Sequence, residues 1–248
     1  DAAHARCSWL SPSPTRMAAL TRAGGMFQKP NTALCIFVKP PIAGRVKTRL
    51  IPSLTPTEAA ELAAAFFADT LALARSCEWA QVVVACDGDP APLGLNLSDV
   101  VWSQGTGDLG ERMERVLRRA LNQLPTAIAI GTDSPGLPRG FLDAAHLQLE
   151  TNDAVVGPCD DGGYYLLGLR RCPKGLLQGL SWSVPTTLEE TVAQLRATGL
   201  AVSKTEPWFD VDIPADLARL KRLLSEEQIF APHTARVLTG PEGYGRPL

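Results

Sequence analysis

The sequence predicts a single α/β domain built on a mostly parallel β-sheet with helices on both faces. Short apolar runs typical of strands alternate along the chain with longer helical patterns. Several of these runs are continuously apolar, as in strands that are buried on both faces. The length of 248 residues suits one large domain, and 45% hydrophobic and 20% charged residues are ordinary for a globular protein.

Each expected element has a local signal. Residues 33–38 form a continuous apolar run, which predicts the first strand. A helix over residues 55–76 begins with Thr55 as cap, Pro56 at the first position and Glu58 as the partner of a capping box. The remaining strands are expected at 81–86, 100–102, 126–130, 154–156, 164–169 and 201–204, and the remaining helices at 109–124, 139–150, 186–198 and from 214 onward.

The expected domain covers residues 29–230, between a disordered N-terminal extension (1–28) and a C-terminal tail (231–248). The first 25 residues are rich in Ala, Ser, Pro and Arg and do not resemble a secretory signal. No apolar run reaches the about 20 residues that cross a bilayer, so we expect a cytoplasmic protein without a membrane partner. The sequence does not indicate an oligomeric state.

Composition and spacing exclude several classes of function. The net charge of −2 provides no basic footprint for nucleic acid. The six cysteines are scattered without a Cys-x-x-Cys pair, which argues against a zinc site or a disulfide framework. No Gly-x-Ser-x-Gly or His-Glu-x-x-His motif occurs, which argues against a serine hydrolase or a zinc protease. The histidines lie far apart, and His146 is expected to be a surface or packing residue on a helix.

A basic loop follows the first expected strand, where ligands of α/β folds collect. It carries Lys39, Arg45, Lys47 and Arg49 within eleven residues, with Gly44 among them. Arg offers a bidentate fork and Lys a point charge, so the loop suits phosphate groups. It lacks the glycine spacing of a Walker A loop or a dinucleotide motif. A solvated basic loop is the alternative reading.

Two acidic segments suit a divalent cation. Asp133 directly follows the expected strand 126–130, and its carboxylate can hold Mg²⁺ or Mn²⁺ that bridges substrate phosphates. Asp210 and Asp212 are two residues apart in extended chain, so they lie on one face and can share an ion. As alternatives, Asp133 caps backbone amides in a turn, and Asp212 caps the helix that begins near Pro214.

Paired carboxylates, glycines and tyrosines follow the expected strand 154–156, in the segment 160–165. Such a turn can supply a base, bind an acceptor or let the backbone approach a ligand closely. A polar turn followed by half-buried tyrosines explains the same residues. Taken alone, this pattern does not indicate a function.

Together, these segments resemble a family of bacterial candidate glycosyltransferases of the nucleotide-diphospho-sugar transferase fold (GT-A, Rossmann-like), often found beside radical-SAM and selenium-domain proteins. More distantly, the chain resembles the guanylyltransferases for phospholactate and for the molybdenum cofactor. Two departures are Ser134, where the family has Cys, and residues 213–215, where it has Thr-Pro-Glu. The resemblance rests on FVKPPIAGRVKTRL (37–50), GDLGERM (107–113), GTDSPGLP (131–138), GPCDDGGYYLLGL (157–169) and DVDIPADL (210–217).

The resemblance implies a role for each motif residue. It implies Asp133 and Asp212 as ligands of Mg²⁺ or Mn²⁺, and Asp161 and Lys47 as catalytic residues. Acceptor binding would fall to Asp160, Gly162, Gly163 and Tyr164. Nucleotide binding would fall to Lys39, Gly44, Arg45, Lys47, Arg49, Asp108 and Arg112.

The leading hypothesis is a metal-dependent glycosyltransferase that uses a nucleotide-sugar donor and a small acceptor, with an acidic group near Asp161 acting on the acceptor. The alternative is a guanylyltransferase-like nucleotidyltransferase that couples a nucleoside triphosphate to a phosphorylated small molecule and releases pyrophosphate. A non-catalytic nucleotide-binding protein is a further alternative. The base, the sugar and the acceptor stay open.

Overall fold

The computed structural model describes residues 29–51 and 53–240, and the expected extension 1–28 lies outside them. The strands are β1 (Thr32–Val38), β2 (Ala80–Cys86), β3 (Val101–Ser103), β4 (Thr126–Ile130), β5 (Ala154–Pro158), β6 (Tyr164–Leu169) and β7 (Val202–Lys204). The α-helices are α1 (Pro56–Arg75), α2 (Leu109–Leu121), α3 (Arg139–Gln148), α4 (Thr187–Ala197), α5 (Pro214–Ser225) and α6 (Pro232–Thr239). Two short 3₁₀ helices are η2 (Thr48–Leu50) and η3 (Ala91–Leu93).

The strands form one seven-stranded sheet in the order β3-β2-β1-β4-β6-β5-β7. The pairs β1–β2, β1–β4, β2–β3 and β5–β7 are parallel, so the prediction of a mostly parallel sheet is confirmed. Strand β6 runs antiparallel to both β4 and β5, because the tight turn after β5 returns the chain directly beside it. The crossovers leave the carboxyl ends of β1, β2, β3 and β4 at one edge of the sheet.

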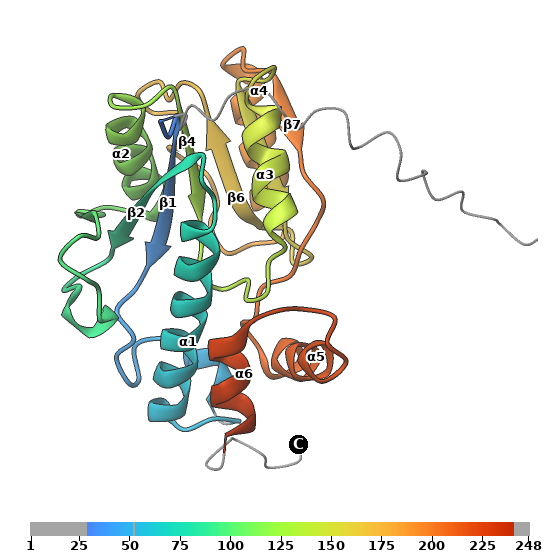
Figure 1. Cartoon of the computed structure of the whole chain (residues 1–248). Helices are drawn as coiled ribbons and strands as arrows, with labels where there is room; N and C mark the ends of the chain where they lie inside the picture. The colour runs from blue at the N-terminus through green and yellow to red at the C-terminus, as the bar shows by residue number, and fades with distance from the viewer. Residues whose placement is uncertain (1–28, 52, 241–248) are drawn as a thin grey trace, which may run out of the picture.

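Helices cover both faces of the sheet, as predicted. On one face, Phe67 and Leu71 of α1 and Leu142 of α3 pack on buried strand residues, and Figure 1 shows these two helices in front of the sheet. On the other face, Leu117 of α2 and Leu195 of α4 belong to a second buried cluster. A sheet that is buried on both faces explains why the strand sequences are continuously apolar.

Helices α5 and α6 extend the fold beyond the sheet, beside the lower part of α1 (Figure 1). Phe66, Leu217 and Leu238 belong to the apolar cluster that joins them. The buried carboxylate of Asp69 accepts hydrogen bonds from the backbone N–H groups of residues 233 and 234 and so caps α6. The segment 231–248 was expected to be a tail, but residues 232–239 form a packed helix. Its eight residues are too few for a clear helical period.

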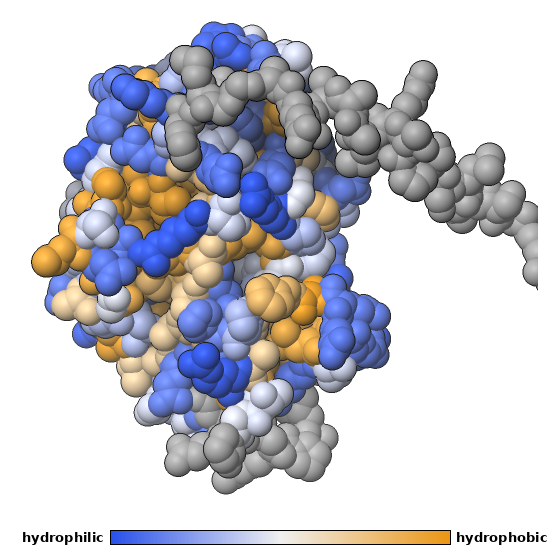
Figure 2. Space-filling view, in the orientation of Figure 1, coloured by the Kyte–Doolittle hydropathy of each residue, from blue (hydrophilic) through white to orange (hydrophobic). Residues whose placement is uncertain are grey.

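Strand β3 forms one edge of the sheet. Leu97, Val100 and Val101, at and before this edge, are exposed, and none of them lines the cavity described below. On the face shown in Figure 2, hydrophilic residues dominate and apolar residues gather beside α1. Among the described residues, no helix combines the length and the hydropathy that a bilayer crossing requires.

Candidate active site

A cavity of about 470 Å³ opens at the carboxyl ends of β1 and β4. Open α/β sheets bind ligands at this edge. The loop after β1, the loop after β4, the start of β6 and the segments 182–187 and 210–212 contribute to its wall. Of the residues predicted for the site, the cavity is lined by Lys39, Arg45, Lys47, Arg49, Arg112, Asp133, Asp161, Gly163, Tyr164 and Asp212. The other four, Gly44, Asp108, Asp160 and Gly162, do not line it.

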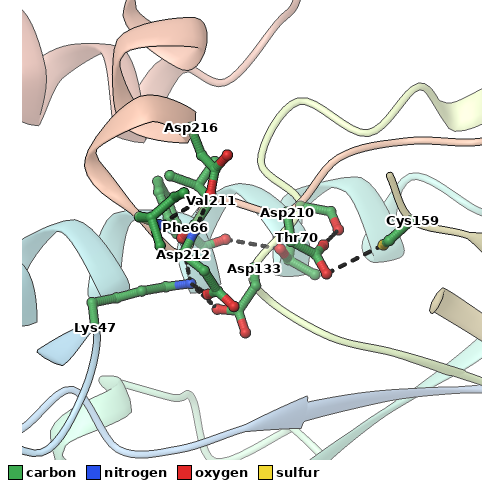
Figure 3. A network of polar contacts seen from close by, with 11 residues as sticks. Lys47, Phe66, Thr70, Asp133, Cys159, Asp210, Val211, Asp212 and Asp216 are labelled. Atoms are coloured by element: carbon green, nitrogen blue, oxygen red, sulfur yellow. Dashed lines mark hydrogen bonds and ion pairs between the residues drawn. The ribbon is translucent and has the colours of Figure 1, made fainter. Parts of the chain in front are cut away.

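Lys47 lies between the two aspartates predicted to bind metal. Its Nζ atom is 2.5 Å from Oδ1 of Asp133 and 3.0 Å from Oδ1 of Asp212, and it donates to the carbonyl oxygen of Val211 at 2.8 Å. Figure 3 shows both carboxylates pointing toward this ammonium group. Three segments that are far apart in sequence therefore meet at one point.

The ammonium group of Lys47 is enclosed, while its partners remain accessible. Its side chain is 7% exposed, whereas those of Asp133 and Asp212 are 49% and 42% exposed. Burial by itself would lower the pKa of Lys47, but the charges of Asp133 and Asp212 outweigh it, so the pKa lies above its ordinary value. Lys47 is therefore a buried, permanently charged partner of two half-exposed carboxylates.

Asp210 lies beside this group and is held by two side chains. Ser134 donates a short hydrogen bond to its Oδ1, and the thiol of Cys159 donates to its Oδ2 at 3.2 Å. Burial, together with the charge of Asp133, raises the pKa of Asp210 to about 6, against the hydrogen bond from Ser134, which lowers it. Ser134 and Cys159 were not predicted as site residues, because nothing in the sequence indicates that they meet Asp210.

The alternative prediction, that the side chain of Asp212 caps α5, is wrong. The carboxylate of Asp216 accepts hydrogen bonds from the backbone N–H groups of both Asp212 and Ile213, at 3.0 Å each. Asp216 therefore satisfies the start of α5, and the Asp212 carboxylate is free to face Lys47. The departure at residues 213–215 does not take Asp212 out of the site.

The donor set fits a hard divalent cation. Among the described residues, the Oδ2 atoms of Asp133 and Asp212 have no hydrogen-bond partner. Their Oδ1 atoms already share one cation, the ammonium group of Lys47. Carboxylate oxygens are the ligands that Mg²⁺ and Mn²⁺ favour. A second group, Cys159, Asp161 and Asp210, places one ligand atom each within 4.8 Å of one another. Of these residues, Asp133, Asp161, Asp210 and Asp212 line the cavity, whereas Cys159 does not.

The remaining cations of the basic loop differ from Lys47. Lys39, Arg45 and Arg49 line the cavity, and within residues 29–51 and 53–240 none of them forms an ion pair. Gly44 has a φ of 76°, a left-handed conformation that glycine adopts without strain, so it shapes the loop. The loop therefore presents three positive charges that remain available to an anion.

The positive charge of Arg112, unlike those of the basic loop, is neutralised by an acidic partner. Its Nη1 donates to Oδ2 of Asp87 at 2.7 Å and to Oε1 of Gln104 at 2.9 Å. Gln104 is buried, and its amide donates to the carbonyl oxygen of Ala85 at 2.8 Å, which fixes its orientation. Asp108, predicted to line the nucleotide pocket, instead caps α2 by accepting from the N–H of Glu111. Glu111 in turn accepts from the N–H of Asp108, which completes a capping box.

In the turn after β5, two of the predicted residues line the cavity and two have structural contacts. Oδ1 of Asp161 accepts from the N–H of Gly163 at 2.8 Å, and both residues line the cavity. Asp160 instead pairs with Arg219 at 2.6 Å. A side chain at Gly162 would meet the backbone of Pro185, so this glycine permits the 182–187 segment to pack on the turn.

Trp182 is a part of the wall that the sequence reading missed. It lines the cavity and packs edge-on against the ring of Tyr164, with ring centroids 6.3 Å apart. Ser183 beside it has a φ of 60°, which is uncommon for a non-glycine residue. No local pattern in the segment 181–187 indicates a site, because it joins the cavity only through tertiary packing.

The fold and the cavity define a class, that of nucleotide-diphospho-sugar transferase-like α/β proteins. The structure of a candidate nucleotide-diphospho-sugar transferase from Desulfovibrio desulfuricans G20 superimposes with a TM-score of 0.73 at 29% identity, over 83% of this chain and 94% of that chain. CMP:2-keto-3-deoxy-manno-octonic acid synthetase, in complex with CTP, shares the fold alone: its TM-score is 0.53 at 14% identity, over 79% and 99% of the two chains.

Two sequence comparisons are more specific. Residues 70–184 match the family described as "Uncharacterized protein conserved in bacteria (DUF2064)". The 2-phospho-L-lactate guanylyltransferase of Methanothermobacter thermautotrophicus is 27% identical over 181 residues, which cover 70% of this chain and 78% of that enzyme. The expected similarity to phospholactate guanylyltransferases is thus confirmed. Of these two, only the Methanothermobacter protein is named as a transferase.

Proposed function

We propose that the protein is a nucleotidyltransferase that couples a nucleoside triphosphate to a phosphorylated small molecule and releases pyrophosphate. The observation that carries this proposal is a set of three cations, Lys39, Arg45 and Arg49, that have no acidic partner in the described part of the chain and lie in the same cavity as Asp133 and Asp212. Cationic side chains and carboxylate-bound metal together neutralise a polyphosphate, which phosphoryl and nucleotidyl transfer require more than a base. The guanylyltransferase relative supports the same reaction.

Asp133 and Asp212 would hold a Mg²⁺ or Mn²⁺ ion, with Asp210 close by. Such an ion withdraws charge from phosphate oxygens and orients them. Lys39, Arg45 and Arg49 would bind the phosphates as charge-assisted donors. This division leaves Lys47 to hold the two carboxylates in place.

The nucleobase would bind near Arg112 and Gln104. Because Asp87 already neutralises Arg112, the guanidinium suits a neutral acceptor better than a phosphate. Its Nη2 donors have no partner among the described residues, and they match a carbonyl edge such as O6 of guanine. We therefore expect a preference for guanine over adenine nucleotides.

The acceptor would bind near Asp161, Gly163 and Tyr164. In nucleotidyl transfer the acceptor phosphate is itself the nucleophile, so no base is needed to deprotonate it. Asp161 would position the acceptor by accepting a hydrogen bond from one of its hydroxyl groups. The hydrogen bond from the N–H of Gly163 holds Asp161 in its turn, which suits a positioning role.

Glycosyl transfer from a nucleotide sugar is the second candidate. The similarity to the candidate nucleotide-diphospho-sugar transferase favours it. In that reaction Asp161 would act on an acceptor hydroxyl, and the same cations would stabilise the departing nucleoside diphosphate.

Product analysis tests the proposal. The protein is incubated with Mn²⁺, each nucleoside triphosphate and a panel of phosphorylated acids, and pyrophosphate is measured. Pyrophosphate formation that Asp133→Asn abolishes supports nucleotidyl transfer. Release of a nucleoside diphosphate from a nucleotide sugar supports the second candidate instead. Nucleotide binding without turnover, unchanged in Asp133→Asn, points to a non-catalytic nucleotide-binding protein.

A further inference from the structure

The ammonium group of Lys47 has no free donor. A lysine ammonium carries three N–H groups. Three acceptors surround it here: Oδ1 of Asp133, Oδ1 of Asp212 and the carbonyl oxygen of Val211. With 7% of its side chain exposed, the group has little access to water. It can donate to an added phosphate oxygen only by releasing one of these partners.

The position of this ammonium group is that of a cation shared by two carboxylates. Asp133 follows β4 and Asp212 precedes α5, and both side chains are partly exposed. A divalent ion drawn to the pair would lie close to the charge of Lys47, and two cations this close repel each other. The backbone of Lys47 has a φ of 48°, a conformation that a lysine rarely adopts. Strain of this kind persists where the surroundings fix a residue firmly.

We propose that Lys47 is the resident cation of the Asp133–Asp212 pair, and that a divalent ion binds this pair in competition with its ammonium group. Lys47 therefore sets the metal affinity of the site and holds the two carboxylates together in the metal-free protein. It acts as a positioning residue and not as a direct ligand of phosphate in that state. This inference rests on the metal pair of the proposed function but not on the reaction.

A titration with Mn²⁺ alone tests the competition. Free Mn²⁺ is followed by electron paramagnetic resonance, and thermal unfolding is recorded with and without Mn²⁺, for the wild type, Lys47→Met and Lys47→Arg. Lys47→Met should unfold at a lower temperature without metal, bind Mn²⁺ at least about tenfold more tightly than the wild type, and gain more stability from it. Lys47→Arg keeps the charge and should stay close to the wild type.

Lys174→Met is the matched control, because it removes one exposed positive charge far from these contacts in sequence and should leave Mn²⁺ affinity unchanged. Lys47→Gln, which retains a donor without the charge, replaces Lys47→Met if that variant does not fold. Equal or weaker Mn²⁺ binding after loss of the charge overturns the competition. If Asp133→Asn leaves Mn²⁺ binding of Lys47→Met unchanged, the metal pair of the proposed function is itself wrong.

Discussion

At the amino end of the sheet, the side chains of Thr32, Thr126 and His146 satisfy one another's hydrogen-bonding groups. At the carboxyl end, Lys47 pairs with Asp133 and Asp212, and each of these carboxylates has a second oxygen without a partner among the described residues. The hydroxyl of Thr32 lies 2.6 Å from that of Thr126 and 2.9 Å from Nδ1 of His146. Trp79 stacks on His146 with ring centroids 4.4 Å apart. This end is a neutral, closed set of contacts.

The carboxyl end is charged and open. Asp133 and Asp212 share Lys47, while Arg45 and Lys39 line the same cavity without an acidic partner in the described part of the chain. Uncompensated charges repel and do not stabilise the fold, so their gathering here supports the proposed binding of an anion. One sheet thus carries a set of polar groups that satisfy one another at one end, and charged groups that are open to a ligand at the other. Substitutions at the two ends should therefore differ in kind.

The largest expected effect follows from Asp133→Asn. Turnover should fall by at least about 100-fold, because a charge-stabilising group is lost. The free energy of unfolding should change by less than about 1 kcal/mol, because Lys47 keeps its contacts with Asp212 and Val211. Steady-state kinetics and urea unfolding measure the two quantities. A large loss of stability with near-normal turnover would contradict a functional role for Asp133 at the carboxyl end of the sheet.

The opposite result is expected for Thr32→Val, which is similar in shape but lacks the hydroxyl. Thr32 is fully buried, so the change leaves Thr126 and His146 each short of a buried hydrogen-bond partner. The protein should lose about 1–3 kcal/mol of stability with unchanged nucleotide affinity. Urea unfolding and calorimetric titration measure these. A change in affinity with normal stability would contradict the separation of the two ends.

Arg45→Ala tests the uncompensated cations. Nucleotide affinity should fall about tenfold, because a charge-assisted phosphate contact is worth roughly 1.5–3 kcal/mol. Stability should stay the same, since Arg45 has no ion pair within the described residues. The affinity loss should shrink at high salt. Arg139→Ala, which removes a paired arginine on α3, is the matched control and should bind nucleotide normally.

The smallest effect concerns pH. Burial lowers the pKa of His146, against the charges of Glu150 and Asp143, which raise it. As the pH falls below about 6.5, the unfolded chain takes up a proton that the folded protein resists, so stability falls toward the lower folded pKa. Above pH 6.5 this contribution is complete. His146→Phe should flatten the slope of unfolding free energy between pH 7 and 5, and an unchanged slope would contradict a lowered pKa of the half-buried His146.

The sequence predicts the sheet better than it predicts the site. The apolar run of β1 and the Thr55 capping box are local signals, and both elements lie where expected. The position of Asp133 after β4 also follows from local pattern. By contrast, Asp108 caps α2 and does not line the cavity. The sequence pattern alone does not show whether this residue caps the helix or binds a nucleotide.

The remaining site residues depend on contacts between distant segments. Lys47 meets Asp212 across 165 residues, and Ser134 meets Asp210 across 76. Trp182 joins the wall because Gly162 lets its segment approach. Periodicity and capping describe neighbours within a few residues, so they do not reveal such pairings.

Calorimetric titration of guanosine triphosphate with Mn²⁺ into the wild type, Arg45→Ala and Asp133→Asn tests the account most directly. We expect tight, Mn²⁺-dependent binding to the wild type, with weaker binding to Arg45→Ala and loss of the Mn²⁺ dependence in Asp133→Asn. Equal affinity in all three proteins, with or without Mn²⁺, would contradict a polyphosphate site at the carboxyl end of the sheet.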